Sequence, residues 1–230
     1  MRVACLSDLH GLLPEPAAVP ECDLLVLAGD VLPDRVNAGS LLDGQRRFFF
    51  EALCPWLEGP LAARVGAVVA VAGNHDELFA AERGLAREGP WRYLLDEGTS
   101  VGGLSVWGTP WSLGDPDWCF TVAGEADLAQ RLSGCPAPID VLVSHGPMWG
   151  LLDASAITGR HRGSLALLDT AARVRPRLVV VGHTHRGRGR YEGPLPGRGG
   201  RFVEHRLVVV NAAAVDADGT SLSEAFLVEL

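Results

Sequence analysis

Short runs of apolar residues recur along the chain and alternate with longer segments in which polar and apolar residues are mixed. The run over residues 24–28 has no polar position, which is typical of strands buried on both faces of a sheet covered by helices. The expected strands are Val3–Ser7, Leu24–Ala28, Val65–Ala72, Leu104–Trp107, Ile139–Ser144, Leu178–Val181, Leu207–Val210 and Ala225–Val228. The segments between them predict helices over Leu41–Leu57, Glu77–Arg87, Glu125–Leu132 and Ser164–Val174. This alternation predicts an α/β fold.

Polar residues of the types that bind metal ions follow five of the expected strands. Because functional sites in open α/β sheets form at the carboxyl ends of strands, these residues predict one site assembled from five loops. They are Asp8 and His10 after the first strand, Asp30 after the second, Asn74 and His75 after the third, His145 after the fifth, and His183 and His185 after the sixth. The glycines at 29, 73, 146 and 182 would let the loop backbones approach the metals closely.

Length and composition agree with one soluble globular domain over residues 1–230, since 47% of the residues are hydrophobic and 21% are charged. No apolar run is long enough to span a membrane. A strand begins at Arg2 and the candidate chemistry begins at Asp8, so we expect no signal peptide and a cytoplasmic protein. The five cysteines are scattered without a Cys-x-x-Cys pair, which indicates reduced thiols and not a metal site.

The net charge of −8 is distributed unevenly. All twenty basic residues are arginines, and eleven of them fall within residues 160–206 with only three acidic residues, so that segment carries +8 and the remainder −16. A solvated surface in an arginine-rich protein explains the absence of lysine, but it explains the clustering less well. A basic segment beside an acidic body suits a local anionic group better than a long nucleic acid, which the body would repel. The stretch Gly187–Gly200 is expected to be a loop.

The motifs at the strand ends are weak individually and informative together. Fifteen aspartates and seven histidines in 230 residues predict about half an Asp-x-His by chance. Five of the seven histidines nevertheless fall within the motifs, which makes purely structural roles a poor explanation. The motifs are Asp-Leu-His at 8–10, Ala-Gly-Asp at 28–30, Ala-Gly-Asn-His-Asp at 72–76, Ser-His-Gly at 144–146 and Gly-His-Thr-His at 182–185.

This order of motifs resembles the calcineurin-like metallophosphoesterase superfamily over residues 3–215. The resemblance implies a four-layer α/β/β/α sandwich with two metal ions held between loops of the two sheets. It also implies that Asp8, His10 and His185 hold one ion, that Asn74, His145 and His183 hold the other, and that Asp30 bridges both. The segments 108–111, 144–153, 175–185 and 210–214 are similar to a branch of metallophosphoesterase-domain-containing proteins linked to cyclic-nucleotide phosphodiester cleavage.

The ligand types themselves limit the metal and the reaction. Carboxylate, amide and imidazole ligands suit Mn, Fe or Zn, whereas Mg alone prefers oxygen ligands. Two such ions about 3.5–4 Å apart would activate a shared hydroxide for in-line attack on phosphorus. We therefore expect a hydrolase of small phosphodiesters, with cyclic nucleotides among the candidates and phosphomonoesters as the alternative. A DNA nuclease and a non-catalytic scaffold are the remaining interpretations.

Several residues outside the ligand set, together with the ligand Asn74, are candidates for substrate contact. In the family, the counterpart of His75 faces the phosphate and protonates the leaving oxygen, although a structural role is the alternative. Asn74, Arg186 and Asn211 are further candidates for binding substrate. Asp34 lies four residues after Asp30, where some branches of the superfamily place an acid three residues on, and its role stays open. Trp107, Trp111, Trp118 and Trp149 either anchor loops, the interpretation we favour, or stack an aromatic part of the substrate.

Overall fold

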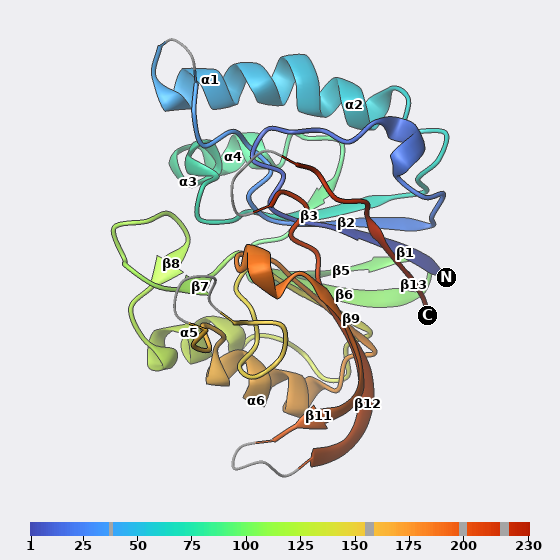
Figure 1. Cartoon of the computed structure of the whole chain (residues 1–230), viewed down its shortest axis with the longest axis vertical. Helices are drawn as coiled ribbons and strands as arrows, with labels where there is room; N and C mark the ends of the chain where they lie inside the picture. Colours follow the sequence, from blue (N-terminus) through green and yellow to red (C-terminus); the bar gives the residue numbers. More distant parts are fainter. Residues whose placement is uncertain (37–38, 155–158, 198–201, 217–220) are drawn as a thin grey trace.

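The computed structural model describes residues 1–36, 39–154, 159–197, 202–216 and 221–230. In these residues two β-sheets pack face to face, and helices cover the outer face of each (Figure 1). The first sheet has the order β13–β1–β2–β3–β4 and the second the order β11–β12–β10–β9–β6–β5. The strands of the first sheet are β1 (Arg2–Leu6), β2 (Leu24–Ala28), β3 (Val68–Val71), β4 (Arg92–Tyr93) and β13 (Phe226–Glu229). Those of the second are β5 (Glu97–Val101), β6 (Leu104–Thr109), β9 (Val141–Ser144), β10 (Leu178–Val181), β11 (Gly189–Pro196) and β12 (Phe202–Asn211).

The central strands are buried on both faces, as the continuous apolar runs predict. In β1, Val3 and Cys5 belong to the core between the sheets, whereas Ala4 and Leu6 face the helical layer. The core between the sheets also contains Val26 of β2 and Val180 of β10. Because strand side chains alternate between faces, a run without polar positions fills both layers at once.

Helices complete the four-layer arrangement that the family resemblance implies. One helical run covers the first sheet and corresponds to the helix expected over residues 41–57; it comprises α1 (Leu41–Phe48), η2 (Phe49–Leu53) and α2 (Cys54–Glu58). It begins at Ser40, whose side chain accepts the Asp43 N–H and so satisfies a free donor of the first turn. On the second sheet lie α5 (Glu125–Leu132) and α6 (Leu165–Val174) (Figure 1). Among the described residues, no helix has the length and apolar character needed to cross a membrane.

Two sequence predictions were wrong in detail. The helix expected over residues 77–87 is divided into α3 (Glu77–Ala81) and α4 (Arg83–Ala86), because Glu82 leaves helical geometry and forms an ion pair with Arg46. The stretch expected to be a loop contains β11, which pairs with β12 at the edge of the second sheet. Leu195 of β11 is fully buried, and the prolines of β11 are tolerated because its outer edge needs no backbone donors.

The parallel strands bring their carboxyl ends to one region. In the first sheet β1, β2 and β3 are parallel to one another, and in the second β9 and β10 are parallel. The two sheets meet directly at this edge, where the Ser7 N–H donates to the Ala212 carbonyl at 3.0 Å. The loops after these five strands therefore lie together between the sheets.

Candidate metal centre

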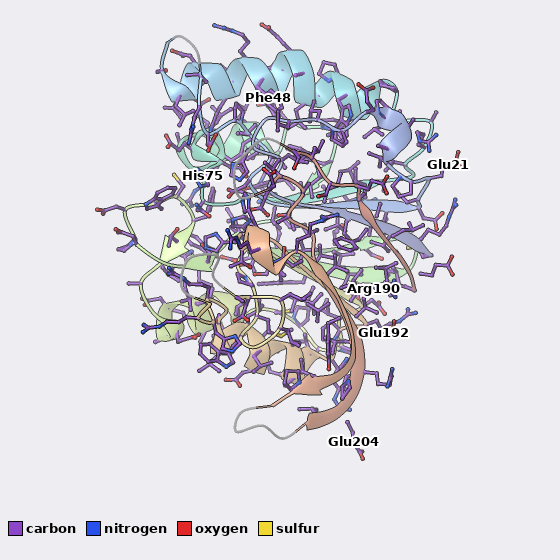
Figure 2. The ribbon with its side chains drawn as sticks, viewed as in Figure 1. Glu21, Phe48, His75, Arg190, Glu192 and Glu204 are labelled. Carbon is purple, nitrogen blue, oxygen red and sulfur yellow. The ribbon has the colours of Figure 1, made fainter. Side chains whose placement is uncertain are left out.

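The structure brings all seven expected ligand side chains together at the edge where the two sheets meet. Asp8, Asp30, Asn74 and His145 are buried, while the other three are partly exposed. Figure 2 shows His75 on the side of the molecule that carries α3 and the two-stranded β7–β8 sheet (Ser112–Leu113 and Thr121–Val122). The centre is therefore open on one side and closed by both sheets on the other.

One group of ligand atoms comes from Asp8, His10 and His185. The Nε2 atom of His185 lies 3.3 Å from Oδ1 of Asp8 and 3.3 Å from Nε2 of His10. The three ligand atoms lie within 4.8 Å of one another. These residues follow β1 and β10, so this group spans the two sheets.

A second group is centred on the amide oxygen of Asn74. This Oδ1 atom lies 3.0 Å from Nε2 of His145 and 2.8 Å from Nδ1 of His183. Asp30 stands between the two groups, because its Oδ2 atom is 3.3 Å from Nε2 of His145 and its carboxylate clusters with the ligand atoms of Asp8 and His145 within 4.8 Å. This placement suits a carboxylate that serves two ions.

The hydrogen bonds of two histidines determine which ring nitrogen faces the centre. His145 Nδ1 lies 2.9 Å from the Ala28 carbonyl, and His185 Nδ1 lies 3.3 Å from the Asp216 carbonyl. A carbonyl oxygen only accepts hydrogen bonds, so each Nδ1 carries the hydrogen and donates it, and Nε2 is left for a metal, the usual arrangement of ligating histidines. Nε2 of His145 then faces an amide oxygen, and two acceptors so close need a proton or a cation between them.

The spacings of the ligand atoms fit a first-row divalent ion. Metal–ligand bonds of about 2.0–2.1 Å place neighbouring ligand atoms roughly 2.8–3.4 Å apart in octahedral or tetrahedral sites. The ligand pairs described above are separated by 2.8–3.3 Å. Both the donor types and their spacings therefore suit two such ions.

Burial and neighbouring charges act against each other on the ionisable groups of this centre. Burial would raise the pKa of the Asp30 carboxyl, but His145 beside it holds that pKa below its ordinary value. Burial opposes protonation of His145, yet Asp30 outweighs it and raises the pKa of His145 to about 10. Asp8 likewise raises the pKa of His185 to about 9 against the effect of burial, whereas burial lowers the pKa of His183 to about 4. Without a metal, protons on His145 and His185 thus balance the negative charges of Asp8 and Asp30. A metal ion has to displace these protons when it binds.

The loop backbones that carry the ligands are strained. Four ligand residues adopt left-handed backbone geometry, which costs of order 1–3 kcal/mol for a residue other than glycine and clusters at functional sites. They are Asp8, His10, Asp30 and His183, with φ between 46° and 66°. The packing of two sheets over this edge has to hold them in place.

Glycines let these strained loops lie against one another. A Cβ atom at Gly73 would collide with the Asp30 carboxylate, and one at Gly182 would collide with Ser7 and Asp8. At Gly29 a Cβ atom would lie 2.5 Å from Nδ1 of His145, closer than real contacts allow. These three glycines therefore let neighbouring loops of the centre approach one another, whereas Gly146 lies against the backbone of Trp111 and Ser112.

Two residues that support the centre were not recognised in the sequence. Buried Asp76 accepts the backbone N–H groups of Asp30, Leu32 and Gly73 at 2.8–2.9 Å and so joins two ligand loops. It stands inside the Asn-His-Asp motif, which was its only sequence signal. Burial raises the pKa of this carboxyl to about 7.

The second unrecognised residue is Gln45 on α1, which is fully buried. Its Nε2 donates to the carbonyls of Pro33 at 2.9 Å and His75 at 2.7 Å, while its Oε1 accepts the Leu78 N–H at 2.8 Å. No local pattern distinguishes this glutamine, because its partners lie 12 to 33 residues away. It links the helical layer to the loops that carry Asp30 and His75.

We expect Gln45→Leu to lower the free energy of unfolding by about 2–4 kcal/mol, because it leaves one buried and two partly buried backbone groups without partners. Urea unfolding of the metal-free protein measures this loss. Gln130→Leu is the matched control, since Gln130 is exposed on α5 and its replacement should change stability by about 0.5 kcal/mol or less. Equal effects of the two substitutions would contradict the supporting role of Gln45.

The remaining candidates are divided between the open side and the scaffold. The side chain of His75 is partly exposed and its ring centroid lies 5.0 Å from that of His10. Asp34 Oδ2 lies 3.9 Å from Nδ1 of His10, in a group with His75. Arg186 is exposed one residue after His185. Asn211 is fully buried, and its amide nitrogen donates to the Leu152 and Thr184 carbonyls, so it holds the turn of the last two histidines from behind.

Two arginines of the basic segment are engaged by groups other than the expected ligands. Arg188 donates to the carbonyls of Ala213 and Glu224, and Arg190 pairs with Glu192. Figure 2 shows Arg190 and Glu192 on the β11–β12 side, well apart from His75 in that view. Part of the arginine cluster in the sequence therefore lies at the edge of the second sheet, away from the candidate site.

Comparison with known proteins agrees with this architecture. The human protein named metallophosphoesterase domain-containing protein 1 is 27% identical over 218 residues, which cover 82% of this chain and 61% of the human protein. The chain thus spans about three fifths of the length of that relative. Among solved structures, the phosphopantetheinyl hydrolase of Mycobacterium tuberculosis is similar with a TM-score of 0.55 at 16% identity, covering 98% of this chain and 95% of that one. A protein of Thermus thermophilus named TT1561 has a TM-score of 0.57 at 16% identity, covering 92% and 88%. At these identities the structural likeness concerns the fold alone.

The family model described as calcineurin-like phosphoesterase matches residues 1–187. This range includes the loops that carry every one of the seven expected ligands. The chain belongs to the calcineurin-like phosphoesterase family.

Proposed function

We propose that this protein hydrolyses small phosphodiesters with the help of two divalent metal ions, and that cyclic nucleotides are among its substrates. The observation that carries the proposal is the convergence of seven side chains with metal-ligand chemistry from five loops on two sheets. A scaffold without catalytic activity would not need this complete set. Phosphomonoesters are the alternative substrate class, and an extended nucleic acid suits the acidic body poorly.

In this proposal Asp8, His10 and His185 hold one ion, Asn74, His145 and His183 hold the second, and Asp30 contacts both. Mn, Fe or Zn suits these ligands better than Mg. When bound, such a pair of ions supplies a nucleophilic hydroxide at neutral pH and neutralises charge on the phosphoryl oxygens. The chain's own groups then have to orient the ester and deliver a proton.

His75 is placed to deliver that proton. Hydrolysis forms a bond from a water oxygen to phosphorus and breaks the bond to the leaving oxygen, which needs a proton if it leaves as an alcohol. The backbone of His75 is fixed on both sides, because its N–H donates to Asp30 Oδ1 at 2.7 Å and its carbonyl accepts from Gln45. Its imidazole stays available to face the substrate and to give a ring proton to the leaving oxygen.

Arg186 and Asn74 complete the proposed substrate site. The exposed Arg186 guanidinium follows His185 directly and suits a phosphate oxygen. We assign Asn211 to the support of the loop and not to substrate contact, because its amide is engaged with Leu152 and Thr184. Since both sheets build one centre, we also propose that residues 1–230 act as a single catalytic domain. The described cysteines are free thiols, which suits a cytoplasmic location.

We expect chelated protein to regain at least about tenfold more activity with Mn(II) than with Mg(II), because four of the seven ligands are histidines. The measurement compares turnover of bis-aryl phosphodiesters, aryl monoesters and 2′,3′- and 3′,5′-cyclic nucleotides after reconstitution with each metal. Higher kcat/KM on the diesters supports the proposed substrate class, and higher values on the monoesters favour the alternative. Full turnover by rigorously metal-free protein would show that the reaction does not use this centre.

A further inference from the structure

Trp118 is exposed directly beside the proposed proton donor. Its centroid lies 4.8 Å from that of His75, and the two rings are nearly perpendicular at 78°. The side of the indole that does not contact His75 is open, since 51% of the residue surface is accessible. Trp107 and Trp111, by contrast, are buried at 2% and 8% and serve packing.

Trp118 is the outer end of a row of four rings that starts at the metal centre. The centroids of His185 and His10 lie 5.2 Å apart, those of His10 and His75 5.0 Å, and those of His75 and Trp118 4.8 Å. When the phosphate is held at the centre, the leaving oxygen that His75 is proposed to protonate lies beside the His75 ring. The organic part of that leaving group then extends toward the indole.

The segment that carries Trp118 is anchored at both ends. Its flanks pair as the strands β7 and β8, and the Trp118 N–H donates to the Asp115 carbonyl at 3.1 Å. At its base Trp111 packs on Phe120, donates to the Asp96 carboxylate at 2.8 Å and lies under the Arg131 guanidinium. The base of the loop is thus packed by Trp111, whereas Trp118 contacts His75 and keeps half of its surface exposed.

The charges of this loop indicate what part of a substrate it accepts. Residues 112–122 contain Asp115 and Asp117 and no arginine. Negative charge repels phosphate groups, so a second phosphate would be unfavourable here. An uncharged flat ring suits an exposed indole that directly follows two aspartates in the loop.

We propose that Trp118 is a specificity-determining residue that stacks on an aromatic ring of the ester, either an aryl group or a nucleobase. This inference rests on the proposed function, because it needs the phosphate to be held at the metal centre. Ring stacking on an aromatic side chain changes binding by about 5- to 150-fold per ring. Trp118 therefore selects aromatic over alkyl phosphate esters.

Binding of two phosphonates to the metal-loaded protein tests the inference without turnover. Phenylphosphonate and methylphosphonate carry the same charged group and differ in the ring, and calorimetry gives both dissociation constants. We expect Trp118→Ala to raise the dissociation constant of phenylphosphonate by about tenfold and to change that of methylphosphonate by less than about twofold. Trp118→Phe should keep most of the affinity for phenylphosphonate. Trp149→Ala is the matched control, since Trp149 is 40% exposed but contacts His161 instead of His75.

The outcomes separate this inference from the proposed function. If both phosphonates bind and Trp118→Ala leaves the phenylphosphonate constant unchanged, the inference is wrong and the proposed function stands. A fall in kcat on all substrates without a change in either constant would likewise overturn it, since Trp118 would then only position His75. If the wild-type protein binds two metal ions and neither phosphonate, the proposed phosphate site fails and the inference fails with it. Elemental analysis of each variant shows that the centre is intact.

Discussion

Asp30→Ala is expected to abolish more activity than the loss of any other ligand, by roughly 10³-fold or more in kcat/KM. Such losses are typical when one member of a group that acts as a unit is removed. The carboxylate of Asp30 lies between the two ligand groups, 3.3 Å from Nε2 of His145, and its other oxygen accepts the His75 N–H. Its removal therefore weakens both ion sites and loosens the loop of the proposed proton donor.

Metal content gives the more direct test of this role. Elemental analysis of Asp30→Ala should show a fall from two ions per chain toward one or none. Asp34→Ala is the matched control, because Asp34 is also a carboxylate near His10, 3.9 Å from its Nδ1 atom, but clusters with His10 and His75 and belongs to neither group of the seven expected ligands. We expect that control to retain both ions and to lose no more than about tenfold in activity. Two tightly bound ions in Asp30→Ala would contradict the bridging assignment.

The strands that could be predicted from the sequence are those that are apolar at every position. Such a run is buried whichever strand it pairs with. The runs at 24–28 and 178–181 are apolar at every position, and both are central strands. The strand β5 alternates between buried and exposed positions and contains a glycine, so it carries a weaker signal. The strand β11 has the glycines and prolines of a turn, and only its pairing with β12 makes it a strand. Sequence patterns therefore failed at the edge strands β5 and β11, whereas the edge strand β13 was predicted over Ala225–Val228.

The residues of the candidate site also differ in how clearly the sequence indicates them. The seven expected ligands could be selected because each follows a strand within a short motif, and the structure brings their side chains together. The contacts of Gln45 with Pro33 and Leu78 arise only when α1 packs on the first sheet, and no motif records them. The left-handed backbone of Asp8 and His10 was equally hidden, because residues other than glycine give no sign of it.

Replacing His75 by alanine is expected to leave the metal ions bound and to remove proton delivery. The hydrogen bonds that tie this residue to the centre are made by its backbone, with Asp30 through the N–H and with Gln45 through the carbonyl, while its ring contacts that of His10. Alanine keeps both of these hydrogen bonds. The variant therefore removes the imidazole while the loop stays anchored, and elemental analysis should still find two ions per chain.

The size of the loss in His75→Ala should depend on the leaving group. Proton delivery is worth about 10²- to 10⁴-fold where the leaving oxygen needs it. A nucleoside alkoxide is strongly basic and needs that proton, whereas p-nitrophenolate is stable without it. We therefore expect a loss of about 10²-fold or more in kcat on a nucleoside ester and less than about tenfold on a nitrophenyl ester.

His161→Ala is the matched control for this prediction, because His161 pairs with Asp153 and stacks on Trp149 outside the ligand groups. It should change the rate on both esters by no more than about twofold. Equal losses on the two esters in His75→Ala, with both ions retained, would mean that the imidazole positions the substrate and that water supplies the proton. A loss of metal would instead make the side chain a support of the centre. Only a loss that grows with the basicity of the leaving oxygen assigns the proton to His75, because positioning and support affect both esters alike.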